Sequence, residues 1–158
     1  MRPWFDLPRW QQLVPALWAG MLLTVALLAT PAPFALLSAA DAGRVVGRML
    51  SHEAHASLAL GGMVLLLERA AARRSAVHGQ GSQFSMGMGL ALGTLFCTVA
   101  GYFALQPMMV AARAGQGLLS FGQLHAASAA FYIAKTGLVL ALAWRATGLR
   151  EAATAAAP

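Results

Sequence analysis

The sequence has few charged residues: Asp, Glu, Lys and Arg together make up only 10% of its 158 residues. Soluble globular domains carry about 25% charged residues, so this chain lacks the side chains needed to cover a surface that faces water. Hydrophobic residues make up 59% of the chain, and the mean hydropathy is +0.65. The composition excludes a disordered or collagen-like chain and favours a polytopic membrane protein.

Cysteine is almost absent, because Cys97 is the only one in the chain. An intrachain disulfide is therefore excluded. The net charge is +6, yet the basic residues are spread between apolar runs. A nucleic-acid-binding face needs clustered Lys and Arg, so we expect the partner of this chain to be a lipid bilayer and not a nucleic acid.

Four apolar blocks indicate membrane-spanning helices, each of which needs about 20 residues. No charged residue occurs between positions 10 and 40, and proline at Pro31 and Pro33 predicts the end of the first helix. The expected architecture is an all-α, four-helix bundle in one domain over residues 1–150, followed by an Ala-rich tail. The expected spans are 10–30, 44–68, 84–109 and 123–145, with a flexible loop over 69–83 and the tail over 151–158.

The basic residues beside the spans predict the orientation, because Lys and Arg accumulate on the cytoplasmic side. With the N-terminus inside, seven arginines flank the spans on the cytoplasmic side and three on the other. The inside set is Arg2, Arg9, Arg69, Arg73, Arg74, Arg145 and Arg150, and the outside set is Arg44, Arg48 and Arg113. We therefore expect a multi-pass protein of the cell inner membrane with both termini in the cytoplasm.

The second predicted helix carries a polar stripe at helical spacing: Asp41, Arg44, Arg48, His52 and His55. Lipid cannot satisfy such a stripe, so we expect it to face other helices or a water-filled cleft. One reading is that the arginines pair with Asp41 and lipid headgroups. The other is a metal site formed by His52, His55 and His125, because neutral imidazole is a common metal ligand. The HExxH protease motif is excluded by the i, i+3 spacing.

A second polar stripe lies on the fourth predicted helix, where His125, Ser128, Tyr132 and Lys135 recur at steps of three, four and three. An ammonium group within a span is costly. Lys135 either extends toward the cytoplasmic interface or faces the bundle interior and contacts carbonyls or the carboxylate of a partner chain.

Small residues recur every four positions on the third predicted helix: Ser85, Gly89, Gly93, Cys97 and Gly101. Such a ridge lets helix backbones approach closely in lipid. We interpret it as a packing surface, either within the bundle or toward a homo- or hetero-oligomeric partner.

Several short motifs resemble the domain of unknown function 4149 family, also called transmembrane protein 205-like: LWAG at 17–20, Pro31 with Phe34, AGRVVGR at 42–48, QPM at 106–108 and LHAAS at 124–128. The resemblance implies a four-helix integral membrane protein that is distantly similar to the copper resistance protein D family. It implies no known reaction.

The sequence contains no arrangement of nucleophile, base and orienting group, so we expect no enzymatic activity and no cofactor. The first hypothesis for function is a structural or accessory membrane component. An alternative is the handling of a copper-like metal, or small-solute transport, through the two polar stripes. Another is a haem-carrying electron-transfer subunit with His55 and His125 as ligands.

Overall fold

A computed structural model describes residues 6–77 and 84–155, with side chains up to residue 148. These residues form helices and no strand. The elements are α1 (Leu7–Thr24), the π-helical segment η1 (Val25–Ala29), α2 (Pro31–Leu36), α3 (Ala39–Val77), α4 (Met86–Thr98), the π-helical segment η2 (Val99–Ala104), α5 (Leu105–Arg113) and α6 (Phe121–Ala155).

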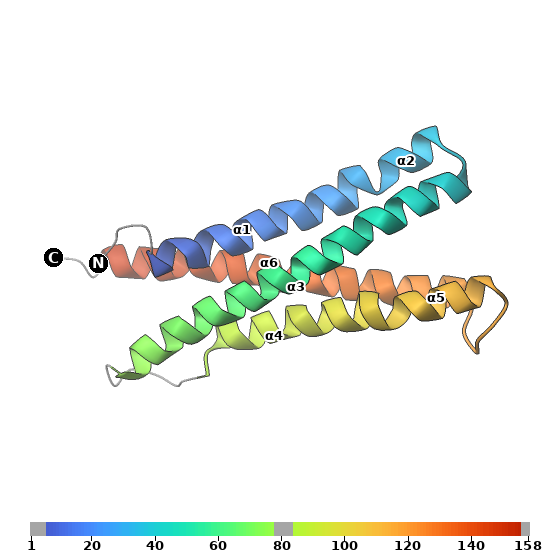
Figure 1. The fold of residues 1–158 in the computed structure, drawn as a ribbon. Coiled ribbons are helices and arrows are strands. Elements are labelled where there is room, and N and C mark those ends of the chain that lie inside the picture. The colour runs from blue at the N-terminus through green and yellow to red at the C-terminus, as the bar shows by residue number, and fades with distance from the viewer. Residues whose placement is uncertain (1–5, 78–83, 156–158) are drawn as a thin grey trace.

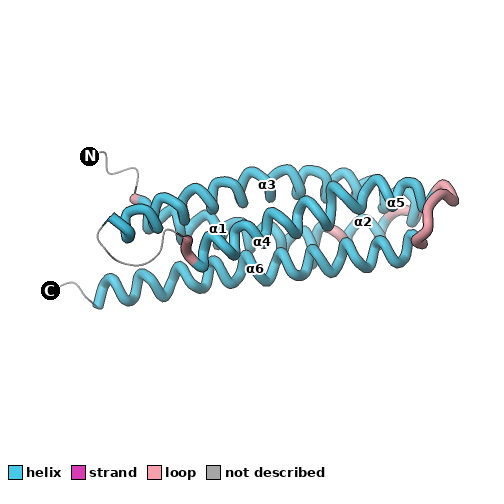
Figure 2. Tube along the Cα trace, turned by 90° about the horizontal axis from the view of Figure 1, so that it is seen from below, coloured by secondary structure: helices cyan, strands magenta, loops and turns pink. Residues whose placement is uncertain are grey.

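The helices form four long rods that lie side by side (Figures 1 and 2). One rod consists of α1, η1 and α2, and another of α4, η2 and α5, while α3 and α6 are continuous. Helices α1 and α4 each pack against both α3 and α6. The start of α1 and the end of α6 lie at one end of the bundle, which we call the terminal end (Figure 1). The α2–α3 and α5–α6 turns lie at the other end, the turn end.

All four rods are long and apolar enough to cross a membrane, which confirms the all-α, four-span prediction. The qualifying helical ranges are Leu7–Leu36, Ala39–Val77, Met86–Arg113 and Phe121–Gly148. They exceed the predicted spans because the helices continue past the apolar blocks. At 1.5 Å per residue, the 39 residues of α3 extend over about 58 Å, well beyond a hydrocarbon core of about 30 Å.

Two local predictions were wrong. Pro31 and Pro33 do not end the first rod, because the π-helical turn over Val25–Ala29 precedes them and Pro31 starts α2, where a missing N–H is tolerated. Residues 69–77 are helical and belong to α3, so the prediction of a loop over 69–83 is wrong for these residues. The remaining part of that predicted loop, 78–83, lies outside the described residues. Helix α6 extends through residues 151–155, within the Ala-rich tail.

An apolar core fills the centre of the bundle. Its fully buried side chains include Trp18 and Leu22 of α1 and Val139 of α6. Many large apolar side chains point outward instead, such as Leu17 (72% exposed) and Leu66 (67% exposed). Monomeric soluble proteins rarely expose such a continuous apolar exterior, and lipid is the environment that suits it.

Close helix packing depends on glycine at defined positions. A Cβ at Gly61 of α3 would lie 2.7 Å from Cδ2 of Leu95 on α4. The α5–α6 turn requires glycine for another reason, since Gly115 and Gly117 have φ of +73° and +112°.

Candidate functional site

The centre of the bundle contains a buried ion pair between two helices. Glu53 of α3 is 5% exposed and Lys135 of α6 is 3% exposed. The Lys135 Nζ atom donates to Oε1 of Glu53 at 2.7 Å. Both residues are 14 positions from the turn-end start of their helix, or about 21 Å along it. The pair therefore lies inside the apolar part of the bundle, where removal of either partner leaves an uncompensated charge.

A chain of hydrogen bonds connects this ion pair to α1. Trp18 Nε1 donates to the Ser57 hydroxyl oxygen at 3.0 Å, and the Ser57 hydroxyl in turn donates to Glu53 Oε1. Trp18 and Ser57 are both fully buried. One carboxylate oxygen thus receives hydrogen bonds from Ser57 and Lys135, and the network joins α1, α3 and α6.

A small cavity of about 40 Å³ adjoins the ion pair between α3, α6 and the rod that contains η2. Glu53, Lys135 and Cys97 contribute to its wall, together with Ser128 and Tyr132 of α6. The Tyr132 ring lies against the ammonium group, with Nζ 4.7 Å from the ring centroid. Thr98 and Tyr102 also line it, so the cavity wall combines two charged residues, four hydroxyl-bearing residues and a thiol.

Two hydroxyl groups of α6 donate hydrogen bonds to the backbone of the two rods that contain π-helical segments. The Ser128 hydroxyl donates to the Gly101 carbonyl in η2 at 2.7 Å. The Tyr132 hydroxyl donates to the Leu22 carbonyl, one turn before η1, at 2.9 Å. π-helical turns occur frequently at functional sites. Here one hydroxyl group connects α6 to η2 and the other connects α6 to the last part of α1.

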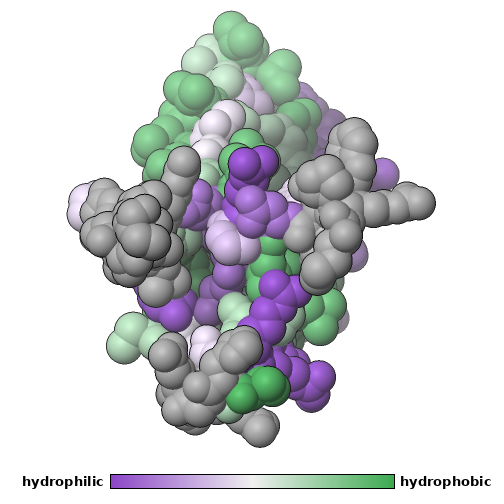
Figure 3. All heavy atoms as spheres, turned by 90° about the vertical axis from the view of Figure 1, so that its left-hand side faces the viewer, coloured by the Kyte–Doolittle hydropathy of each residue, from purple (hydrophilic) through white to green (hydrophobic). Residues whose placement is uncertain are grey.

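A second polar cluster joins all four rods at the terminal end and is centred on Glu68 of α3. Its Oε2 atom accepts from Arg145 Nη1 of α6 at 3.0 Å and from the Ser85 hydroxyl at 3.3 Å. Its Oε1 atom accepts from Gln11 Nε2 of α1 at 2.9 Å. Ser85 also caps α4 by accepting from the Met88 N–H. Hydrophilic side chains gather across this end of the bundle (Figure 3).

The polar stripe on α3 does not face the bundle, contrary to the sequence prediction. Arg44, Arg48, His52 and His55 are exposed and Asp41 is partly exposed. Arg44 pairs with Asp41 one turn away, and the Ser38 hydroxyl donates to Asp41 at 2.7 Å. The buried face of α3 is the opposite one, where Ala42, Val46, Ala54 and Val64 lie together with Glu53, Ser57 and Glu68. The first reading of the stripe, a local pairing of Arg44 with Asp41, agrees with this geometry.

The three histidines proposed as metal ligands do not converge. Across residues 6–77 and 84–155, no three or more His, Cys, Asp or Glu side chains are placed to hold a metal ion together. The His55 Nδ1 atom lies 2.7 Å from the Ser51 carbonyl oxygen, and its ring packs edge-on against Phe103. His125 stacks on Phe121 near the start of α6. The predicted site of His52, His55 and His125 is therefore corrected: all three side chains are exposed, and the His55 and His125 rings contact Phe103 and Phe121 and not one another.

The stripe on α6 is divided between two environments. Lys135 faces the interior, as one of the two predicted alternatives required, but its carboxylate partner is Glu53 of the same chain and not a residue of a partner chain. Ser128 and Tyr132 also reach other helices, whereas His125 is exposed.

The small-residue ridge on the third rod packs within the chain over part of its length. A Cβ at Gly93 would lie 3.1 Å from Leu138 of α6, and Gly101 packs against Phe131 of the same helix. Cys97 is buried. Gly89 is exposed and has no atom within 4 Å of an added Cβ, and Ser85 caps α4.

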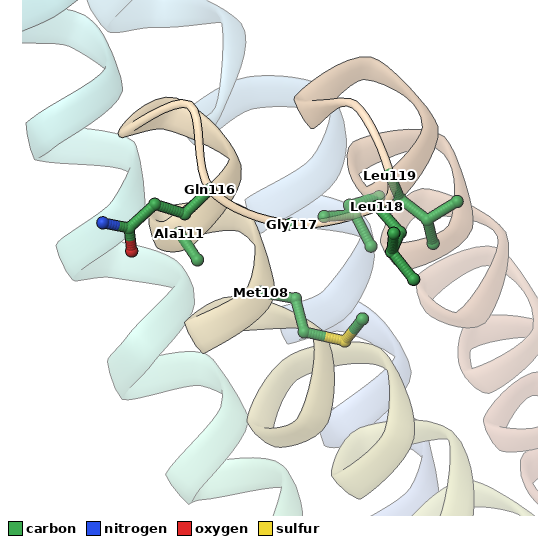
Figure 4. Close-up of a pocket in the computed structure, with 7 residues that line it drawn as sticks. Met108, Ala111, Gln116, Gly117, Leu118 and Leu119 are labelled. Carbon is green, nitrogen blue, oxygen red and sulfur yellow. The ribbon is translucent and has the colours of Figure 1, made fainter.

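An apolar depression of about 460 Å³ lies at the turn end (Figure 4). Its walls come from α5, the α5–α6 turn and α6, and include Met108, Ala111 and Leu118. It lies apart from the ion pair and offers almost no polar group for recognition of a ligand.

Sequence reasoning did not identify Glu53, Ser57 and Glu68 as inward-facing residues. The available signal was their spacing, because Glu53, Ser57, Gly61, Val64 and Glu68 follow one another at steps of four, four, three and four. These steps place a polar residue, small residues and two carboxylates on a single face of the helix.

Comparison with known proteins gives one match. A family model described as "Domain of unknown function (DUF4149)" matches residues 13–117. No curated protein and no solved structure matches the chain.

Proposed function

Because the chain belongs to the domain of unknown function 4149 family, whose description assigns no activity, we propose a function from the geometry: a structural or accessory component of the inner membrane without enzymatic activity. One observation carries this proposal. The two buried carboxylates, Glu53 and Glu68, are bonded to side chains of the other rods, so the polar residues inside the bundle hold the helices in fixed positions.

The orientation and the membrane form part of the proposal. Arg9, Arg69, Arg73, Arg74 and Arg145 belong to the terminal end, whereas Arg44, Arg48 and Arg113 belong to the turn end. This distribution favours a cytoplasmic terminal end. In a bacterial-type cell, the membrane that borders the cytoplasm is the inner membrane.

The surface proposed for association is the outward face of α4. Gly89 leaves the backbone open there, and the neighbouring Leu92 is 43% exposed. Small residues let a second helix approach closely, and dispersion between the backbones then stabilises the contact. A second copy of this chain or another membrane protein would occupy this face.

Site-specific photo-crosslinking in native membranes tests the proposal. A photoreactive residue at Leu92 of α4 should give a discrete protein–protein product. The matched control is Leu66 of α3, which is 67% exposed, and its crosslinks should be to lipid. Lipid adducts alone at both positions would contradict an accessory role that acts through α4.

A further inference from the structure

The cavity beside Glu53 and Lys135 contains polar groups that the protein leaves with unused hydrogen-bonding capacity. The hydrogen bonds from Ser57 and Lys135 to the Glu53 carboxylate both end on Oε1. Within residues 6–77 and 84–148, every fully buried side-chain nitrogen or oxygen has a partner. Because no hydrogen bond ends on Oε2, that atom is not fully buried, and Glu53 is one of the residues that line the cavity.

Lys135 has a similar surplus. An ammonium group has three donors, and one of them is used in the bond to Glu53. The Tyr132 ring provides a further, non-directional contact at 4.7 Å. The hydroxyl groups of Ser128 and Tyr132 donate their hydrogens to backbone carbonyls, so the lone pairs of their oxygens remain free to accept.

We propose that this cavity is a hydrated binding site inside the membrane, which takes water or a neutral polar molecule of similar size between Glu53 and Lys135. A buried water needs two to four polar partners, and Glu53 Oε2, Lys135 Nζ and the Ser128 hydroxyl supply three from two helices. At about 40 Å³ the cavity has room for one or two such molecules.

This proposal does not depend on the accessory role. It concerns the molecules that occupy the cavity beside the ion pair, whereas the accessory role concerns the association of α4 with another protein. Its consequence is that the two charges are solvated by water as well as by each other. That lowers the penalty of a bare ion pair in a low-dielectric medium.

The single cysteine of the chain is a built-in probe, because Cys97 contributes to the cavity wall. The experiment follows its S–H stretch by infrared spectroscopy after the protein, in lipid nanodiscs, is transferred to D2O. Water in the cavity should exchange the thiol hydrogen directly. A thiol in a dry core must wait for local opening of the bundle.

The dry control is Val139→Cys in a Cys97→Ser background, since Val139 is fully buried in the apolar core one turn from Lys135. The wet control is Ser128→Cys in the same background. The thiol hydrogen of Cys97 and that of Ser128→Cys should exchange at least about tenfold faster than that of Val139→Cys. Only the Val139→Cys thiol has to wait for the core to open.

Equally slow exchange at Cys97 and Val139→Cys overturns the proposal, because the cavity is then dry. Equally fast exchange overturns it too, because water then enters the whole bundle and not this site. If Ser128→Cys does not fold, the comparison of unaltered Cys97 with Val139→Cys still decides.

Discussion

Glu53 and Lys135 illustrate how far single residues could be interpreted from the sequence. Lys135 stands alone in a span, and a lone ammonium has few acceptable positions in lipid, so an interior position was among the predicted alternatives. Glu53 was missed because it lies between His52 and His55, which form part of a more conspicuous polar stripe. Which face of α3 turns inward is decided by the small residues opposite that stripe, and side-chain polarity alone does not reveal it.

The ion pair leads to a prediction about stability. Glu53→Gln should lower the free energy of unfolding by about 3–5 kcal/mol, because it leaves the Lys135 ammonium buried without a counter-charge. Glu53→Gln combined with Lys135→Met should recover most of this loss, since no charge then remains to be compensated. Denaturant titration of the detergent-solubilised protein measures both.

The matched control for this experiment is the exposed pair of Asp41 and Arg44, whose side chains are 47% and 78% exposed. Asp41→Asn should change the unfolding free energy by less than about 1 kcal/mol, because water solvates both groups. If the double variant is no more stable than Glu53→Gln alone, the loss of stability in Glu53→Gln is not caused by an uncompensated charge on Lys135.

At the scale of helices, the chain's apolar blocks predicted four spans, and the described part of the chain contains four helical rods that are long and apolar enough to span a membrane. The π-helical segments η1 and η2, which join the α-helices within two of the rods, could not be predicted in the same way. A π-helical turn such as Val25–Ala29 adds a residue to the helical turn, and just before it the Leu22 carbonyl of α1 accepts a hydrogen bond from the Tyr132 hydroxyl of α6. The residue pattern of one helix does not predict such a contact with another helix.

Two glycines of α4, separated by one residue, should respond to alanine in opposite directions. A Cβ at Gly87 would overlap the Glu68 carboxylate and the Arg145 guanidinium, whereas a Cβ at Gly89 meets nothing within 4 Å. Gly87→Ala should therefore destabilise the protein by about 1–3 kcal/mol through overpacking. Gly89→Ala should be neutral or stabilising by up to about 1 kcal/mol, because alanine favours helix.

Thermal unfolding of the two variants in one detergent gives the comparison directly. Equal melting temperatures would mean that the Glu68 cluster can move aside without loss. In that case the cluster would not be the contact that holds the terminal end of α4 in place.

For the molecule as a whole, the number of spans and the arginine distribution together predict topology. Reporter fusions at the N-terminus and after residue 158 should both report the cytoplasm. A reporter inserted at Gly117, in the α5–α6 turn, should report the opposite side. Termini found on opposite sides of the membrane would require an odd number of crossings and would contradict the four-rod arrangement.

Metal chemistry was the part of the sequence-based interpretation that depended most on tertiary structure. His52, His55 and His125 come from two helices, and their convergence required both helices to turn the same polar face inward. They do not, because burial of Ala42, Val46 and Ala54 turns that stripe of α3 outward. The kinship with the copper resistance protein D family stays an expectation.

The order of the helices also affects how the protein is made. Glu53 and Lys135 are 82 positions apart, so Glu53 is synthesised and delivered to the bilayer well before Lys135 exists. During that interval its carboxyl group has no cationic partner within the nascent chain's apolar segments. When α6 inserts, the Glu53 carboxylate is already in the bilayer as a counter-charge. It lowers the free-energy cost of inserting Lys135, which would be high for a lysine without a partner. Membrane integration of α6 should therefore depend on α3, even though the two segments are not neighbours in the chain.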